Sequence, residues 1–366
     1  MSEIIKKIIA LKDTERKILV GDIMESEKGL KEAFCKMLNM AGEPLQEKFY
    51  KSLPQGWDGF IKEQAKGEIT ISPQKEEKAL EEISKMMAGI GATMAKLEMN
   101  TVKAKKQTLK FRETMKAGFI KLEKVISDQT KGLERGPLQK ECPKDAEVIE
   151  LPKPGKTVLK KPDIFDCIGD RKSRRKYTDD PLTLEELSYL LWATQGIKKL
   201  MANGKVGLRT VPSGGCMHPF ETYLAVNNVT GLKKGMYRYQ PVDHKLVKLF
   251  TVGSMPKKLA KAALGQDFVG NCAATFIWSA VPYKTEWRYS LEAKKIILQD
   301  SGHLCQNLYL ACESIGCGTC AIGAYNQKLF DKLCQLDGRD EFVVYVAPVG
   351  RVTDQTVGNV GNVENV

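Results

Sequence analysis

The stretch from Leu291 to Ile315 reads LEAKKIILQDSGHLCQNLYLACESI and predicts one long helix without a proline. Its second half is apolar on most sides, so we expect this helix to be buried, either in a large core or in a dimer interface. The short apolar run from Cys317 to Ile322 follows it directly and predicts a buried strand. We therefore expect a domain built around this helix-strand pair.

Other segments around this pair alternate between strand and helix patterns. Those that read as strands or as a hairpin are Glu221–Val226, Gly235–Phe250, Cys272–Val281 and Phe342–Ala347. Thr183 and Glu186 have the spacing of a capping box, and Gly196 is placed to end the helix that this box begins. This mixture predicts an α+β domain over residues 163–352.

The chain before this domain has a different pattern. Residues 1–135 read as an all-α domain of unknown role, and prolines and glycines over residues 136–162 predict a linker. Within the helical region, apolar residues at alternating spacings of three and four form a seam: Leu80, Ile83, Met87, Ile90, Met94 and Leu97. The seam fits a helical hairpin packed on itself or an intermolecular coiled coil. A polar tail, residues 353–366, closes the chain.

Composition and charge bound the function. The 366 residues are 42% hydrophobic and 28% charged, as in ordinary globular proteins, and carry a net charge of +12. That charge allows a nucleic acid, an anionic membrane surface or a phosphate-bearing ligand. Because most of the excess lies after residue 150, much of it between Lys156 and Lys176, we favour the phosphate and do not expect a nucleic acid.

The sequence also predicts where the protein resides. It shows no secretory signal and no apolar run long enough for a membrane span, so we expect a cytoplasmic protein that does not enter the membrane. In that setting its ten cysteines are expected to be mostly buried, reduced thiols.

Three segments carry candidate chemistry. Arg171–Tyr177 (RKSRRKY) combines arginine forks with a hydroxyl, which suits a phosphate, although a nucleic-acid contact or a solvated basic turn has the same composition. Pro212–Phe220 (PSGGCMHPF) and Gly316–Tyr325 (GCGTCAIGAY) are glycine-rich, so their backbone can approach a flat ligand closely. A surface loop and a tight helix-to-strand connection are the alternatives for these two.

Together, the order and spacing of these segments resemble the nitroreductase-like flavoenzyme superfamily, in particular its SagB-type dehydrogenase branch, over about residues 163–352. The supporting stretches also include Gly235–Tyr239, Glu286–Tyr289, Asp300–Leu308 and Pro348–Gly350. The resemblance implies an α+β fold, a homodimer with FMN at the subunit interface, and hydride transfer through flavin N5 to or from a small organic substrate. The donor would be NAD(P)H or the substrate itself.

Carried over position by position, the resemblance assigns cofactor-binding roles. Arg171, Ser173 and Arg175 would hold the FMN phosphate with Lys172 nearby, and Arg351 would close that site. Pro212, Ser213 and Gly214 would lie along the isoalloxazine and ribityl, while Gly323 and Ala324 would present backbone near the N5 edge.

The catalytic candidates are Tyr289, Arg288 and His218. Azoline oxidases of this branch carry a Lys-Tyr pair before the long helix, which corresponds here to Arg288-Tyr289, and Cys216 replaces an Asn found in many nitroreductases. Arginine stays charged and is a poor proton acceptor, which counts against thiazoline or oxazoline oxidation. Tyr289 is either a proton donor or a structural residue. His218 is a candidate acid or base.

The positions of the two other histidines can also be predicted, and two alternative functions stay open. His303 is expected in the core and His244 in solvent. Cys312, Cys317 and Cys320 have the C-x4-C-x2-C spacing of a [2Fe–2S] site, with Cys334 following, so an iron–sulfur electron carrier is one alternative. We expect no metal, because a predicted helix and strand would hold two of these cysteines. The other alternative is a helical interaction protein with a degenerate flavin domain, in which the N-terminal helices bind a protein partner.

Overall fold

The computed structural model describes residues 99–112, 115–119, 125–251 and 253–353. The chain divides into two compact units, Met1–Ala104 and Lys105–Val366, and the elements below all belong to the second. Residues 99–112 are helical. The expected helical domain up to residue 98, with its seam, and the tail from residue 354 lie outside the described residues. Residues 125–135 form turns and irregular chain, not the expected helix.

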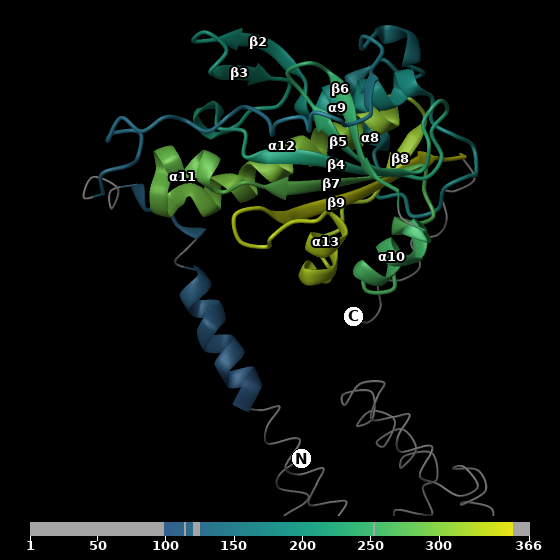
Figure 1. Cartoon of the computed structure of the whole chain (residues 1–366). Helices are drawn as coiled ribbons and strands as arrows, with labels where there is room; N and C mark the ends of the chain where they lie inside the picture. Colours follow the sequence, from purple (N-terminus) through teal and green to yellow (C-terminus); the bar gives the residue numbers. More distant parts are fainter. Residues whose placement is uncertain (1–98, 113–114, 120–124, 252, 354–366) are drawn as a thin grey trace, which may run out of the picture. The chain divides into compact units, whose positions relative to one another are not determined.

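Seven strands form one sheet in the order β1-β6-β5-β4-β7-β9-β8, with every neighbouring pair antiparallel (Figure 1). Its strands are β1 (Val148–Glu150), β4 (Phe220–Val226), β5 (Gly235–Gln240), β6 (Lys245–Phe250), β7 (Ala274–Ala280), β8 (Cys317–Thr319) and β9 (Phe342–Arg351). A separate hairpin pairs β2 (Ile197–Met201) with β3 (Val206–Arg209). The strands predicted from apolar runs are confirmed, except that β8 ends at Thr319 and not at the expected Ile322.

The helices are α8 (Ile164–Asp170), α9 (Leu184–Gln195), α10 (Met255–Ala262), α11 (Tyr283–Tyr289), α12 (Ala293–Ser314) and α13 (Gln327–Leu333). Short 3-10 turns span Lys156–Val158, Gly214–Cys216, Asp267–Val269 and Ser290–Glu292. The capping box of α9 is present, and Gly196 ends that helix, as predicted. In the described part of the chain, no helix has the length and apolarity needed to cross a membrane.

Helices cover both faces of the sheet (Figure 1). In β4, Leu224 and Val226 belong to an apolar cluster that includes α9 and α12, while Tyr223 and Ala225 belong to a second cluster that includes α10 and α13. Successive side chains of a strand point to opposite faces, so a strand covered on both faces needs apolar residues at every position. This explains the continuous apolar runs and confirms the α+β domain.

Helix α12 is the long buried helix that the sequence predicts. At 1.5 Å per residue its 22 residues span roughly 33 Å. Leu304, Cys305 and Leu308 are buried in the cluster that it shares with α9, whereas Gln299, Gly302, His303 and Gln306 are exposed at spacings of three and four. The helix therefore packs in the core of this domain and keeps one exposed face.

Part of the expected linker packs on the sheet. We call residues 128–150 the strap. Within it, β1 pairs with the edge strand β6. Its main-chain oxygens also accept hydrogen bonds from buried arginines: Arg209 Nη2 donates to Leu138 O at 2.9 Å, and Arg238 donates to Glu141 O. The prolines and glycines thus exclude a helix here, as expected, but the segment still packs on the domain.

An ion pair ties the middle of the strap to the sheet. Lys140 Nζ lies 2.5 Å from Glu341 Oε2, and Glu341 Oε1 accepts hydrogen bonds from Tyr223 and Ser279 at 3.0 and 2.6 Å. Glu341 is buried, and a buried carboxylate without its cation is costly. The strap therefore satisfies polar groups that the sheet itself leaves in the interior.

We predict that a chain beginning at Lys105 keeps the stability of the second unit, whereas one beginning at residue 152 loses at least about 3 kcal/mol. The longer deletion removes the strap partner of each of Arg209, Arg238 and Glu341, at roughly 1–3 kcal/mol per group. Urea unfolding of the two truncated chains and the full chain measures this. Equal unfolding midpoints for the two truncated chains would contradict the role given to the strap.

Candidate functional site

The basic segment from Arg171 to Tyr177 lies along β8. Arg171 caps the C-terminus of α8, and three residues later the Arg174 N–H donates to Thr319 O at 2.9 Å. A Cβ on Gly318 would fall 2.6 Å from Arg174 Cβ, so only glycine at this position allows the segment to approach the strand so closely. The first and third sequence-predicted segments are therefore neighbours.

Tyr309 of α12 joins these two segments. Its hydroxyl lies 3.1 Å from Ser173 Oγ and accepts the Ala321 N–H at 2.8 Å. The Arg171 guanidinium stands over the ring, 5.4 Å from the centroid, in a cation–π contact. Burial raises the pKa of the Tyr309 hydroxyl, which therefore stays protonated near neutral pH.

Donors exceed acceptors around Tyr309. Lys172, Ser173 and Arg175 are exposed, and Arg171 is half-buried. Within the described ranges, none of these three cations forms an ion pair with a carboxylate. Arg174 Nε and Nη1 are buried without a hydrogen-bond partner there, and its Nη2 is 4.0 Å from Glu313 Oε2. Such a surplus of N–H and O–H donors fits an anion with several oxygens.

The second segment is fixed to the same helix. Ser213 Oγ donates to Asp300 Oδ2 at 2.5 Å, and the Gly214 N–H donates to Asp300 Oδ1 at 3.2 Å. The His218 N–H in turn donates to Ser213 Oγ at 2.9 Å. Burial raises the pKa of Asp300, while the hydrogen bonds from Ser213 and Gly214 lower it. Since Asp300 and Tyr309 are nine residues apart, their anchoring points are about 13–14 Å apart along α12.

Arg288 and Tyr289, at the end of α11, contact this loop. A Cβ on Gly215 would lie 2.6 Å from the Tyr289 hydroxyl oxygen and 3.3 Å from Arg288 Nε. Gly215 has a φ of 57°, in the left-handed region that glycine adopts most easily. The structure therefore brings two of the catalytic candidates beside the glycine loop.

The three histidines have different environments. His218 is buried, and its pKa is lowered to about 3, first by burial and then by the charges of Arg209, Arg135 and Lys284. Its imidazole is therefore neutral near pH 7, available only as a proton acceptor. The other two expectations were wrong: His244 bonds to Ser188 and Tyr239 at 2.7 Å each, and His303 is an exposed residue of α12.

The remaining cofactor candidates divide into two groups. Gly323 and Ala324 are exposed in the loop after β8, and a Cβ on Gly323 would meet nothing within 4 Å. Arg351 differs from the expectation, because its guanidinium forms a two-bond ion pair with Glu186 at 2.9 and 2.8 Å and also donates to Ile315 O. Glu186 thus takes up the donors that were expected to close a phosphate site.

The four cysteines of the iron–sulfur alternative are distributed over both sides of the sheet. Cys312 and Cys317 belong to the apolar cluster of α9 and α12, while Cys320 and Cys334 belong to that of α10 and α13. Burial raises the pKa of Cys317 to about 12 and also raises that of Cys320. Across the described ranges, no group of three or more His, Cys, Asp or Glu residues is placed to hold a metal.

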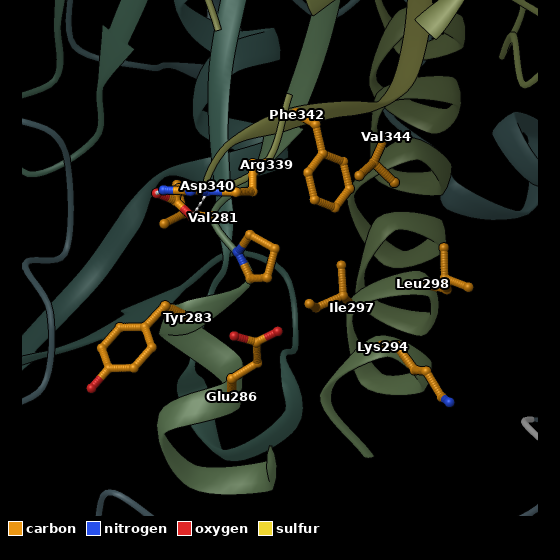
Figure 2. A pocket seen from close by; sticks show the side chains of 11 residues that line it. Val281, Tyr283, Glu286, Lys294, Ile297, Leu298, Arg339, Asp340, Phe342 and Val344 are labelled. Carbon is orange, nitrogen blue, oxygen red and sulfur yellow. Dashed lines mark hydrogen bonds and ion pairs between the residues drawn. The ribbon is translucent and has the colours of Figure 1, made fainter. Parts of the chain in front are cut away.

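Two cavities adjoin α11. One, of about 700 Å³, lies between α11, α12 and the start of β9; Figure 2 shows Ile297, Phe342 and Val344 at its apolar side, with the Arg339–Asp340 ion pair opposite. The other, of about 940 Å³, lies between the strap, the loop at Gly215 and the end of α11. Arg135 lines this second cavity. The sequence did not identify Arg135 as a candidate, because this residue lies at the predicted domain boundary without a motif around it.

A seven-stranded antiparallel sheet with helices on both faces defines an α+β domain, with a surplus of N–H and O–H donors beside the buried helix. The sequence model of the nitroreductase family matches residues 168–351, and the chain belongs to this family.

Similar proteins agree with this assignment. "Putative nitroreductase MJ1384" of Methanocaldococcus jannaschii is 33% identical over 186 residues, which are 51% of this chain and 89% of that protein. The trifolitoxin-processing protein TfxB of Rhizobium leguminosarum bv. trifolii is 28% identical over 121 residues, 32% of each chain. Among solved structures, a nitroreductase from Ralstonia eutropha is 27% identical with a TM-score of 0.47, covering 60% of this chain and 99% of that one.

We predict that His218→Gln makes the protein less sensitive to acid. The His218 pKa is about 3 in the folded state and near 6.5 in the unfolded state, so between these values the unfolded state binds more protons. The wild type therefore loses stability as pH falls below 6.5, by up to about 1.4 kcal/mol per pH unit from this residue. Urea unfolding from pH 7 to pH 5 should show the free energy of unfolding falling less in the variant than in the wild type. A difference between the two proteins that does not change with pH would contradict the buried neutral imidazole.

Proposed function

We propose that this protein is an FMN-dependent oxidoreductase that transfers a hydride through flavin N5 to or from a small organic substrate. The observation that carries the proposal is the donor-rich segment Arg171–Arg175, in which Arg171 and Ser173 contact Tyr309 of α12. The same helix holds the glycine loop through Asp300. A ligand with a phosphate at one end and a flat ring system at the other needs both kinds of contact.

The residues at the phosphate end fit the group chemically. Arginine offers a planar fork of donors that matches phosphate oxygens, and the Ser173 hydroxyl adds one more donor. Arg174 contributes two buried nitrogen atoms that find no partner among the described residues, and Lys172 adds charge nearby. We leave Arg351 out of this group, because Glu186 occupies its guanidinium.

At the ring end, we assign Pro212, Ser213 and Gly214 to the isoalloxazine and ribityl. The backbone of Gly323 and Ala324 would take the N5 edge, where space is open around Gly323. When bound, FMN supplies two-electron chemistry to this site, while the protein supplies position and electrostatics. Asp300 holds the Ser213 hydroxyl and the Gly214 N–H, so the loop is fixed before a ligand arrives.

We also propose a homodimer with the flavin at the subunit interface, the arrangement that the family resemblance implies. Exposed apolar side chains support it. On α8, Ile164, Phe165 and Ile168 have exposed fractions of 59%, 82% and 60%, and Leu298 on α12 has 64%. Apolar groups that remain together on the surface of a single chain are typical of interfaces. A protein partner for the N-terminal region is a separate proposal, which rests on the predicted seam alone.

The SagB-type branch is our finer proposal for the reaction. The similarity to the trifolitoxin-processing protein, whose name describes the processing of trifolitoxin, supports it. Arg288 stands where the azoline oxidases of this branch have lysine, and an arginine beside the loop is suited to binding rather than to accepting a proton. We therefore propose hydride transfer to or from a substrate other than a thiazoline or oxazoline.

Replacing Arg171 and Arg175 together with Ala is expected to abolish FMN retention, because it removes both arginine forks from the phosphate end. The matched control is Lys257→Ala with Lys258→Ala on α10, which removes the same charge at exposed positions. Flavin per chain, measured by absorbance after heat release, should fall to near zero only in the arginine variant. Equal flavin content in both variants would place the phosphate elsewhere.

Anaerobic mixing of the flavin-loaded protein with NADH or NADPH identifies the electron donor. Loss of the oxidised flavin absorbance assigns the donor as a nicotinamide. An unchanged spectrum with both, in a protein whose flavin dithionite still reduces, assigns that role to the substrate, as the SagB-type branch predicts. A flavin that is reduced by none of NADH, NADPH and dithionite would contradict a redox role for the site.

A further inference from the structure

The cavity of about 940 Å³ beside the glycine loop is built from four separated parts of the chain. Strap residues 129–139 form one side, and Trp287 and Arg288 of α11 form another. The turn Gly204–Val206 and the loop Gly215–Met217 complete the lining, with Val242. Its volume is at the upper end of the range for small-molecule sites, roughly 300–1,000 Å³.

The strap and α11 are joined around this cavity. The Trp287 Nε1–H donates to Leu133 O, and the Gln129 N–H donates to Trp287 O, both at 2.9 Å. Tyr283 of the same helix donates to Asp128 at 3.1 Å. The two walls are therefore held in place by hydrogen bonds, so the cavity is a feature of the folded domain.

Two guanidinium groups line the cavity. Arg135 Nη2 donates to Cys216 O and, at 3.2 Å, to Met217 O, which anchors this side chain at the loop. Arg288 lies over the Tyr289 ring, 5.4 Å from its centroid, and beside Gly215. Burial lowers the pKa of Arg135, and the charge of Arg288, which lines the same cavity, lowers it further.

Acidic partners for these arginines are missing from the described residues. Glu134 is the one acidic residue among the cavity's lining residues, and it pairs with Lys205 at 3.3 Å on the outside, where its side chain is 89% exposed. Across the described ranges, neither Arg135 nor Arg288 forms an ion pair with a carboxylate. Arg135 is half-buried and Arg288 is exposed at the cavity. Two like charges at one cavity favour an anion bound there.

Apolar side chains make up much of the remaining lining, which also holds the polar Gln129, Glu134, Gln139 and Lys205. Leu133, Pro137, Val206, Met217, Val242 and Trp287 supply hydrophobic surface around the two cations. A ligand complementary to this cavity has an apolar body, against these side chains, and one acidic group, between the arginines. A carboxylate matches the planar fork of a guanidinium in a two-bond arrangement.

We propose that this cavity binds the organic substrate of the oxidoreductase and that the substrate is an apolar carboxylic acid held by Arg288 and Arg135. The inference rests on the proposed function, which places the flavin ring at the same loop. Arg288 then serves as a binding residue and not as a proton acceptor. A dinucleotide phosphate carries the same sign of charge, but several phosphates would find apolar walls on most sides of this cavity.

Phenylacetate and its neutral isostere phenylacetamide test the proposal on the full-length protein as purified. Isothermal titration should show phenylacetate binding at least about tenfold more tightly than the amide. Arg288→Gln should remove this preference, while Arg288→Lys should keep part of it because it keeps the charge. The matched control is Lys294→Gln on α12, which removes one positive charge at the other cavity and should leave both affinities within about twofold of wild type.

Three outcomes overturn the proposal: equal affinity for the acid and the amide, unchanged phenylacetate affinity in Arg288→Gln, and binding of 2′,5′-ADP without phenylacetate binding. The last would assign the cavity to the phosphate of a nicotinamide dinucleotide. Flavin content, measured on the same samples, separates this failure from that of the proposed function. A flavin-loaded protein that does not bind phenylacetate refutes the substrate class alone. A protein that takes up no flavin refutes the proposed FMN-dependent function.

Discussion

The packing of α12 through the centre of the domain is the constraint on which the candidate site depends. Asp300, on one turn of the helix, holds the Ser213 hydroxyl and the Gly214 N–H, and Tyr309, further along, contacts Ser173 and Ala321. Segments far apart in the sequence thereby take fixed positions along one rigid axis. A helix packed on one face of a sheet is suited to this task, because a shift of either end requires repacking the core.

Burial of charge is the second organising feature. Arg209, Arg238 and Glu341 lie in the interior, and their partners include main-chain oxygens and a lysine of the strap. The same segment carries Arg135 to the carbonyls of the glycine loop. The strap therefore links the stability of the sheet to the shape of the cavity beside the glycine loop. This explains why a stretch without helix or sheet over most of its length is packed so closely on the domain.

Local sequence patterns predicted most of the fold. Apolar runs identified β7 and β9, and the Thr183–Glu186 box and Gly196 marked both ends of α9, because each of these signals acts over a few residues. Contacts over long sequence separations were not predictable. Arg351 meets Glu186, and Leu138 meets Arg209, through the tertiary fold alone. His303 lies three residues from the buried Asp300 on the same helix, and hydropathy alone did not place it on the exposed face.

The central claim is that segments held by α12 form an FMN site, and the chromophore of the purified protein tests it most directly. Absorbance of the native protein, followed by heat release and mass analysis of the supernatant, should give a yellow protein that releases FMN at close to one molecule per chain. A colourless protein that takes up no FMN on reconstitution would contradict the account. So would a brown protein with acid-labile sulfide and no flavin.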